Sequence, residues 1–390
     1  MGKLTIYVAA HKEYTVQRIP GYTPIQVGAA LHEKLPYLSD STGDNISEKN
    51  PYYSELTGMY WAWKNDHESD IVGIAHYRRY FIDEDNVILD EKKIRNILSK
   101  YDVITSELNG LEEGHSIREQ YEQLHEPADV AVARDVIQEL YPEYLKDYDE
   151  VMNGTSTYIC NMIIAKKKLF DRYCEWMFSI LFEMEKYIDP EKYNNYNKRC
   201  FGLISERLET VWIRHNRLAV CEMRLGCTEE KFETRETREQ GEKLIEERRL
   251  DEILPLMQDA YDKRPDMFLW TSDITGRLSD LLMIGRIIEA EKATGTGSGC
   301  FKTLTKAKDV YAVLDRIKGY MNSKTNVDEI CSFIVENDLS PAMVKTTFLS
   351  DRSGADLMTF VAQLAEGFAR IGDMNRTAFY AQMAIMAAEG

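Results

Sequence analysis

Short, nearly continuous apolar runs recur through the first 165 residues of this 390-residue chain. They predict strands that are covered on both faces, at residues 4–9, 71–75, 101–105 and 158–165. Between them, apolar residues recur at three- and four-residue spacing. Asn50-Pro51 opens one such helical segment, and another covers residues 168–188. Strands that alternate with helices predict an α/β fold with a mainly parallel sheet.

The pattern changes near residue 230, where we expect a domain boundary. All seven His, 19 of the 23 Tyr and four of the five Trp lie before it, and the apolar spacing after it is helical throughout. We therefore expect an α/β domain over residues 1–230 and an all-α accessory domain over residues 231–390, with a break at 294–300. Residues 364–384 resemble a single tetratricopeptide-type helical hairpin.

Composition narrows the class of protein. The chain has 48 Lys+Arg and 65 Asp+Glu, a net charge of −17, which argues against a surface that binds nucleic acid. No segment approaches the ~18 apolar residues that span a bilayer, and the N-terminal apolar stretch is too short for a signal peptide. We expect a cytoplasmic protein, with peripheral membrane contact left open. Seven scattered cysteines without a CxxC pair support neither a disulfide framework nor a zinc site.

The pentad His76-Tyr77-Arg78-Arg79-Tyr80 directly follows the apolar run at 71–75. Ligands of open parallel sheets bind beyond the carboxyl ends of strands, so this pentad is a candidate anion site. If the chain stays extended, His76, Arg78 and Tyr80 point to one side of the sheet and the other two to the opposite side. One arginine would then hold a diphosphate while the other pairs with a protein carboxylate; structural salt bridges for both are the alternative.

Two further polar segments are candidates for the nucleoside end of a ligand. His11 and Lys12 follow the first predicted strand, where such folds commonly meet a nucleotide. Asp44 and Asn45 lie in a turn-rich loop, and their side chains can accept a hydrogen bond from a ribose or sugar hydroxyl or from a uracil N–H. Solvated turns are the alternative interpretation of both segments.

Two patterns have residue types that bind metals. Asp83 and Asp85 form the Asp-x-Asp arrangement by which many nucleotide-sugar enzymes hold Mn²⁺ or Mg²⁺, although a solvated loop has the same composition. His125 and Asp129 would share a helix face at i, i+4 spacing. A zinc site would need further ligands, and Pro127 disturbs a regular helix there, so a buried hydrogen bond between the two is favoured.

Glu206 is a carboxylate in a helix whose faces are otherwise apolar. Such a carboxylate can serve as a general base with a raised pKa. It can equally be the ion-pair partner of Arg207 or Arg199, and the local sequence favours the ion pair.

Together these segments resemble a bacterial family of glycosyltransferases that was long catalogued as a domain of unknown function and is associated with capsular and exopolysaccharide synthesis. The resemblance covers residues 3–226 and does not extend beyond residue 230. The motifs that carry it are Ile6-Tyr7-Val8-Ala9-Ala10-His11-Lys12, Gly43-Asp44-Asn45-Ile46-Ser47, Glu55-Leu56-Thr57, Tyr60-Trp61-Ala62-Trp63-Lys64-Asn65, His76-Tyr77-Arg78-Arg79-Tyr80-Phe81, Asn161-Met162 and Gly202-x-x-x-Glu206-Arg207-Leu208.

The resemblance implies a GT-A-like, Rossmann-related fold that takes a nucleotide-diphosphate sugar. In related folds a metal-binding Asp-x-Asp follows a central strand, and here His76-Tyr77-Arg78 takes that place, so cationic side chains would make a metal dispensable. Asn161 would frame the donor sugar. Glu206 is similar to the acidic position that activates the acceptor hydroxyl, and His125 and Asp129, which lie within the match, are kept as catalytic candidates.

The sequence hypothesis is therefore a hexosyltransferase-type enzyme that moves a sugar, preferably from a UDP-sugar, to a hydroxyl of a glycan, a lipid-linked oligosaccharide or a glycoprotein. It needs no cofactor, with Mn²⁺ or Mg²⁺ at Asp83 and Asp85 as the alternative. Acceptor recognition and self-association are both open for the helical part. The rival functions are a non-catalytic scaffold with a partner-docking tail and another nucleotide-handling transferase. The expected donor-binding residues are His11, Lys12, Asp44, Asn45, His76, Tyr77, Arg78, Arg79 and Asn161.

Overall fold

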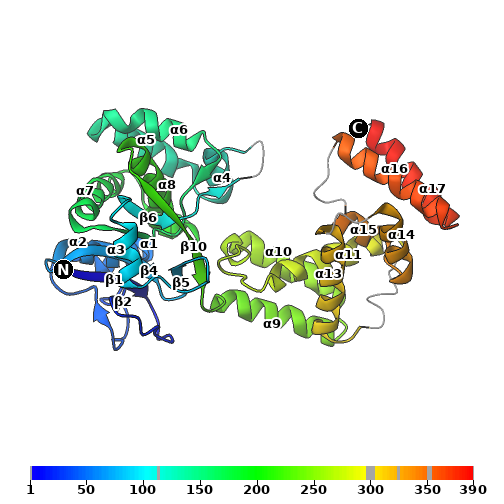
Figure 1. The fold of residues 1–390 in the computed structure, drawn as a ribbon, viewed down its shortest axis with the longest axis horizontal. Helices are drawn as coiled ribbons and strands as arrows, with labels where there is room; N and C mark the ends of the chain where they lie inside the picture. Colours follow the sequence, from blue (N-terminus) through cyan, green and yellow to red (C-terminus); the bar gives the residue numbers. More distant parts are fainter. Residues whose placement is uncertain (1, 112–114, 296–303, 323–325, 349–353, 390) are drawn as a thin grey trace. The chain divides into compact units, whose positions relative to one another are not determined.

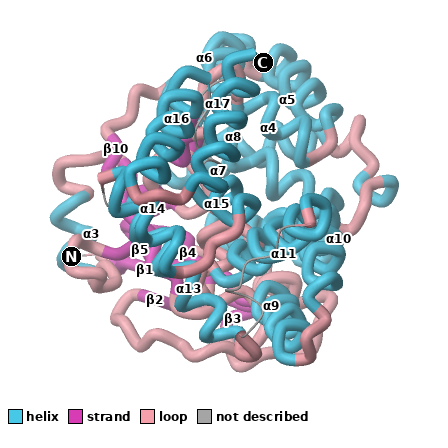
Figure 2. Tube along the Cα trace, turned by 90° about the vertical axis from the view of Figure 1, so that its right-hand side faces the viewer, coloured by secondary structure: helices cyan, strands magenta, loops and turns pink. Residues whose placement is uncertain are grey.

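The computed structural model describes residues 2–111, 115–295, 304–322, 326–348 and 354–389 (Figure 1). The chain divides into two compact units, Met1–Glu229 and Glu230–Gly390. In unit 1, strands and helices alternate along the chain, whereas the described part of unit 2 is helical (Figure 2). Among the described residues, no helix has both the length and the apolar character needed to cross a membrane.

Unit 1 is built on an eight-stranded sheet with the order β3-β2-β1-β4-β5-β10-β6-β9, in which β4 also pairs with β9. A two-stranded sheet joins β7 and β8. The strands are β1 (Lys3–Ala10), β2 (Tyr22–Gln26), β3 (Leu38–Ser39), β4 (Ser69–His76), β5 (Arg79–Ile82), β6 (Val103–Ser106), β7 (Asn109–Gly110), β8 (Ser156–Thr157), β9 (Ile163–Lys166) and β10 (Val220–Cys227).

The large sheet is mixed but mainly parallel, as predicted, because six of its eight strands run in one direction. The strands β3, β2, β1 and β4 run parallel, and so do β10 and β6. However, β9 runs antiparallel to both β4 and β6, and β5 runs antiparallel to β4 and β10. The physical reason is local: β5 returns from β4 through a tight turn instead of a helical crossover, and such a hairpin must be antiparallel.

The helices of unit 1 pack mainly on one face of this sheet. Tyr7, Val72 and Ile74 point from the strands into the larger core, which the faces of α1, α2 and α4–α8 complete. The opposite face packs a smaller core against α3. The helices are α1 (Asn50–Tyr53), α2 (Leu56–Asn65), α3 (Glu91–Ile97), α4 (Ile117–Leu124), α5 (Pro127–Leu140), α6 (Leu145–Met152), α7 (Lys167–Met184) and α8 (Cys200–His215), with short 3₁₀ turns η1 (Ser47–Lys49), η2 (Pro142–Tyr144), η3 (Pro190–Lys192) and η4 (Asn197–Arg199).

Two local features differ from the sequence pattern and shape the site. The segment predicted as a strand from residue 158 is extended only from Ile163, because Cys160 and Asn161 adopt left-handed backbone angles, with φ of 75° and 50°. The helical segment opened by Asn50-Pro51 is interrupted at Ser54, whose φ is 51°, and restarts as α2.

Unit 2 has its own apolar core, which is contributed by its helices. The predicted hairpin at residues 364–384 is present as α16 and α17, joined by Gly372 in a left-handed turn and by stacked rings of Phe368 and Tyr380. Of the predicted break, residues 294 and 295 end α11, and residues 296–300 lie outside the described chain. The elements are α9 (Phe232–Glu246), η5 (Leu250–Glu252), α10 (Ile253–Lys263), η6 (Pro265–Met267), α11 (Arg277–Thr294), α13 (Ala307–Asn322), α14 (Val327–Glu336), α15 (Pro341–Phe348), α16 (Gly354–Arg370) and α17 (Met374–Glu389).

Candidate functional site

The turn between β4 and β5 sets the geometry of the candidate site. His76 ends β4, Arg79 begins β5, and the two residues are paired across the hairpin with Tyr77 and Arg78 in its turn. Nη1 of Arg79 lies 3.4 Å from Nδ1 of His76. Because the chain turns back instead of staying extended, His76 groups with Arg79, which differs from the expected grouping of His76 with Arg78 and Tyr80. The pentad therefore presents two sets of side chains.

The first set, which we call the cation cluster, consists of His11, Lys12, Tyr77 and Arg78. The register places Ala9 of β1 beside His76 of β4, so both strands end at this edge of the sheet. The Tyr77 ring centre lies 5.3 Å from the His11 ring centre, 5.3 Å from Nζ of Lys12 and 5.6 Å from Cζ of Arg78. Lys12 is also 3.8 Å from the carboxylate of Glu229. One aromatic ring thus lies among three side chains that can carry positive charge.

Arg78 is buried without a counter-ion. Only 7% of the residue is exposed, and its Nη1 has no hydrogen-bond partner in the described chain. Within the same residues, no carboxylate lies at ion-pair distance from Arg78. Burial, followed by the charge of Arg79, lowers the pKa of Arg78. A buried guanidinium with an unused donor is costly unless an anion reaches it, so Arg78 is suited to bind one.

The second set includes His76 and Arg79 of the pentad together with Glu55, Asn161, Ser205 and Glu206, and we call it the carboxylate cluster. Asn161 makes the contacts that hold it together. Its Nδ2 donates to Oε1 of Glu55 at 2.7 Å and to the carbonyl of Gly202 at 2.9 Å. Its Oδ1 accepts from Oγ of Ser205 at 2.8 Å. Asn161 is fully buried, and these contacts join the start of α2, the turn before β9 and the first turns of α8. The amide orientation follows from the three partners together.

Glu206 completes this cluster from α8. Oε1 accepts the backbone N–H of Cys160 at 2.9 Å, and Oε2 accepts from Nη1 of Arg207 at 2.8 Å. The ion pair between Glu206 and Arg207 that the sequence favoured is therefore present, and both carboxylate oxygens are engaged.

Burial and neighbouring charges shift the pKa values of Glu55 and His76 in the carboxylate cluster. Burial raises the pKa of Glu55, and the charge of Glu206 adds to this, against the hydrogen bond from Asn161. Burial, and then the charges of Arg79 and Arg78, hold the pKa of His76 well below its usual value, so the ring is neutral. A guanidinium can only donate, so a neutral His76 that accepts from Arg79 at Nδ1 carries its proton on Nε2.

The loop with Asp44 and Asn45 lies toward the other end of α2. The backbone N–H of Asp44 donates to Asn65, the last residue of α2, and a carboxylate oxygen of Asp44 accepts from Tyr60. Asn45 bonds carbonyls of its own loop and the N–H of Ser47. Since Glu55 precedes the first residue of α2 and ten helical residues span ~15 Å, these contacts place the loop one helix length from the carboxylate cluster.

His125 follows α4, which ends at Leu124, in extended conformation, whereas Asp129 lies in the first turn of α5, which begins at Pro127. The shared helix face expected from their spacing is therefore wrong. Nδ1 of His125 lies 3.2 Å from Oδ1 of Asn197, and Asp129 accepts from the hydroxyls of Tyr121 and Tyr193, both at 2.9 Å.

Both side chains are buried beneath the carboxylate cluster. Burial raises the pKa of Asp129 to about 6. Tyr121, which donates to Asp129, lies with its ring centre 5.1 Å from the Arg207 guanidinium, so Asp129 is linked to Glu206 through two intervening side chains.

Asp83 and Asp85 do not fit a metal bound between them and a diphosphate. One Asp83 oxygen accepts the N–H groups of Asp85 and Val87, and the other pairs with Lys93, which lowers the pKa of Asp83. Asp83 therefore lacks the open oxygen atoms that a shared cation requires. Over the described ranges, no three His, Cys, Asp or Glu side chains are grouped so as to hold a metal.

Sequence reasoning missed two carboxylates of this region. Glu55 belongs to the motif Glu55-Leu56-Thr57, but it was assigned no role from the sequence. Its position directly before a mostly apolar helix is the signal that could have identified it. Glu209 is fully buried, and its Oε1 lies 2.6 Å from Oγ1 of Thr105. Burial raises the pKa of Glu209 to about 8, so it is protonated near neutral pH.

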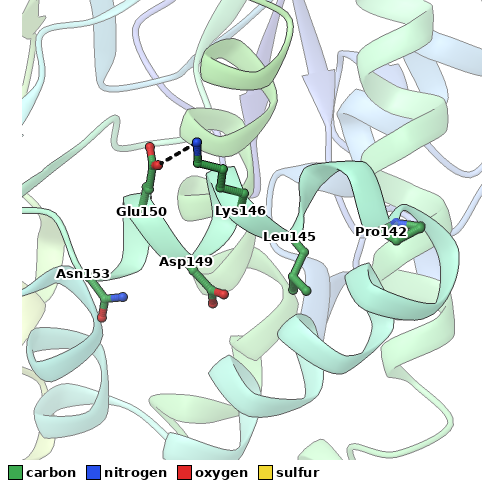
Figure 3. A pocket seen from close by; sticks show the side chains of 6 residues that line it. All are labelled: Pro142, Leu145, Lys146, Asp149, Glu150 and Asn153. Carbon is green, nitrogen blue, oxygen red and sulfur yellow. Dashed lines mark ion pairs between the residues drawn. The ribbon is translucent and has the colours of Figure 1, made fainter.

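A separate surface depression of about 670 Å³ lies along η2 and α6 (Figure 3). Figure 3 shows Lys146 reaching Glu150 across one side of it. It includes none of the candidate site residues and is lined by Pro142, Leu145, Lys146, Asp149, Glu150 and Asn153.

Comparison with known proteins tests the predicted resemblance. The structure is similar to the apo structure of WbbM, a bifunctional glycosyltransferase, with a TM-score of 0.55 and 31% sequence identity. The alignment covers 59% of this chain and 46% of WbbM, so the chain corresponds to less than half of that protein. No curated protein sequence matches. Residues 5–217 match the family described as a domain of unknown function, DUF4422. This span includes both clusters, and the chain belongs to the DUF4422 family.

Proposed function

We propose that unit 1 is a GT-A-like glycosyltransferase domain that takes a nucleotide-diphosphate sugar and transfers the sugar to a hydroxyl group, with unit 2 as an accessory domain. The observation that carries the proposal is Arg78, a buried guanidinium with an unused donor at the shared carboxyl edge of β1 and β4. Similarity to a bifunctional glycosyltransferase supports this class of reaction. UDP-sugars are the donors to test first.

The cation cluster suits the leaving group of such a reaction. Breaking the bond between the sugar and the diphosphate places negative charge on the diphosphate, and fixed cations stabilise that charge without a metal. Arg78 would bind the diphosphate through charge-assisted hydrogen bonds, with Lys12 and His11 adding positive charge. The Tyr77 ring would hold these side chains in place and offer a flat surface to the ligand.

Calorimetric titration with UDP and with uridine tests the assignment. Replacing Arg78 by Met removes the charge and keeps an extended side chain. We expect Arg78→Met to weaken UDP binding by about 10-fold or more, because a hydrogen bond to a charged group is worth ~1.5–3 kcal/mol. Uridine, which lacks the diphosphate, should bind both proteins equally.

Arg224→Met is the matched control, because the Arg224 guanidinium bonds only loop carbonyls of Asp83 and Glu84 among the described residues. A hydrolysis screen over UDP-, GDP- and dTDP-sugars, with Mn²⁺ or with EDTA, identifies the donor. Unchanged UDP affinity in Arg78→Met contradicts the diphosphate site. A native protein that binds no nucleotide and hydrolyses no nucleotide sugar contradicts the function and favours a scaffold.

A further inference from the structure

The carboxylate cluster contains two glutamates, Glu55 and Glu206, and a displacement at the sugar needs one group to take the proton of the acceptor hydroxyl. We propose that Glu55 is that group and that Glu206 is a positioning residue. This inference rests on the proposed function and deepens it, since it assigns the base of the same site.

The hydrogen bonds of the two carboxylates separate their roles. Both oxygens of Glu206 are engaged, one by the N–H of Cys160 and one by Arg207. Each Glu206 oxygen therefore already accepts a hydrogen bond, so an acceptor hydroxyl would have to compete there with a protein donor. Glu55 accepts from Asn161 at Oε1, and its Oε2 takes no hydrogen bond from another residue of the described chain. Glu55 is partly exposed as a residue, and we assign Oε2 as the oxygen that the acceptor hydroxyl reaches.

The surroundings of Glu55 also raise its affinity for a proton. Burial and the nearby charge of Glu206 oppose its ionised form, while Asn161 and Arg199 favour it, and the pKa is raised overall. Burial lowers the pKa of Arg79, but Cys160, Cys227, Glu55 and Glu206 outweigh this effect. His76 cannot take the role at its Nδ1, which faces Arg79. A general base works best with a pKa closer to the operating pH, so the rise favours Glu55.

Backbone strain points to the same place. Seven described residues other than glycine have positive φ, and three of them flank the Glu55–Asn161 contact: Ser54 at 51°, Cys160 at 75° and Asn161 at 50°. Such conformations cost about 1–3 kcal/mol each and persist where the surrounding structure enforces them, commonly at functional sites. Here Ser54 turns the chain just before Glu55 and α2. The left-handed angles at Cys160 and Asn161 direct the Asn161 amide toward Glu55.

The proposed step balances as a single displacement. The acceptor oxygen forms a bond to the anomeric carbon as the bond from that carbon to the diphosphate breaks. The electron pair of the broken bond stays on the diphosphate, beside Arg78, and the hydroxyl proton moves to Oε2 of Glu55. Glu55 then releases the proton to solvent. Such a displacement inverts the configuration at the anomeric carbon.

The test compares Glu55→Gln, Glu206→Gln and the control Glu68→Gln, a surface residue paired with Lys3. The probe is the nucleotide sugar that the native protein turns over, with water or the acceptor as recipient. We expect Glu55→Gln to lower kcat on the order of 100-fold or more, with UDP affinity unchanged by calorimetry. Glu206→Gln should mainly raise KM and lower the melting temperature, and Glu68→Gln should match the native protein.

Two readouts do not depend on whether Glu55→Gln folds well. The native kcat should fall as the pH drops through the raised pKa of Glu55, and Glu206→Gln should keep this acidic limb. Formate should restore part of the turnover of Glu55→Ala, because a small carboxylate can take the proton, whereas a structural role gives no rescue.

Three outcomes would overturn the assignment of Glu55 as the base while the proposed function stands. They are a near-native kcat in Glu55→Gln, loss of the acidic limb only in Glu206→Gln, and a product with retained configuration at the anomeric carbon. A native protein that turns over no donor overturns both.

Discussion

The two sides of the β4–β5 hairpin differ in how far the protein satisfies its own polar groups. In the carboxylate cluster, Asn161 uses both its amide nitrogen and its oxygen on protein partners, and Glu206 uses both its oxygens. In the cation cluster, Arg78 is buried with a donor unused and no carboxylate at ion-pair distance in the described chain. The carboxylate and amide groups of the first region are paired within the protein, whereas the charge of Arg78 lacks a carboxylate partner among the described residues.

On the proposed function, this difference separates two tasks that we assign to adjacent residues. A buried charge needs a partner, and on the proposed function the charge of Arg79 is balanced within the protein and that of Arg78 by the diphosphate of the ligand. A preorganised base is useful only if its neighbours hold it in place, whereas an anion site must leave donors free for the anion. The hairpin turn at Tyr77 and Arg78 allows both within four residues.

The largest expected effect tests this contrast directly through stability. Arg79→Met should lower the free energy of unfolding by about 4 kcal/mol, because it removes a buried cation that interacts with Cys160, Cys227, Glu55 and Glu206. Arg78→Met should leave the stability unchanged or raise it, because the charge that it removes has no carboxylate partner among the described residues. Urea unfolding followed by Trp fluorescence measures this in unit 1, which holds four of the five Trp.

Added UDP sharpens the same comparison. It should stabilise the native protein and Arg79→Met but stabilise Arg78→Met less, because binding to the folded state raises its stability by RT ln(1 + [UDP]/Kd). Equal destabilisation by the two Arg→Met changes would contradict this difference between the carboxylate cluster and the cation cluster.

Much of the sheet could be predicted from the sequence, because its strands are buried on both faces and read as apolar runs. The runs at 4–9 and 71–75 lie within β1 and β4, and the pentad after β4 was identified by its position at a strand end. The helical character of residues after 230 followed from spacing in the same way. These features depend on burial, and burial is visible in the sequence as the spacing of apolar residues.

The arrangement of the site could not be predicted in this way. Whether His76 groups with Arg78 or with Arg79 depends on a two-residue turn, and no glycine or asparagine marks that turn. Left-handed angles at Cys160 and Asn161 interrupt an apolar run that predicts a strand, because tertiary contacts to Glu55 and Glu206 override local preference. Those contacts join residues more than 40 positions apart.

A smaller effect concerns Asp129, which lies behind the carboxylate cluster. Its pKa of about 6 in the folded protein exceeds the value of an unfolded aspartate, so the folded state binds the proton more tightly. The stabilisation is complete below pH ~4 and is lost as the pH rises through 6. Asp129→Asn should remove about 2 to 3 kcal/mol of this pH dependence, measured by urea unfolding at pH 4 and pH 7.5. Identical pH slopes in both proteins would show that Asp129 is not protonated in the folded state.

The smallest expected change in stability tests how closely the carboxylate cluster is held. A Cβ on Gly202 would lie 3.3 Å from Oγ of Ser54 and 3.3 Å from the carbonyl oxygen of Tyr53, so Gly202→Ala must move α8 slightly away from the residues that precede Glu55. Alanine favours a helix by up to ~1 kcal/mol over glycine, which offsets much of the close contact, so stability should change by less than about 1 kcal/mol.

Turnover should respond more strongly than stability to this change. The carbonyl of Gly202 anchors the Asn161 amide that holds Glu55, and small displacements of a catalytic group cost about 10-fold or more in rate. UDP affinity should stay the same, because the Gly202 carbonyl holds Asn161 of the carboxylate cluster. Gly319→Ala is the matched control: it lies in helix α13 with open space around it, so it should add helix stability in unit 2 without changing turnover. If Gly202→Ala lowered UDP affinity and turnover together, the two clusters would be mechanically coupled, and their separate roles would have to be abandoned.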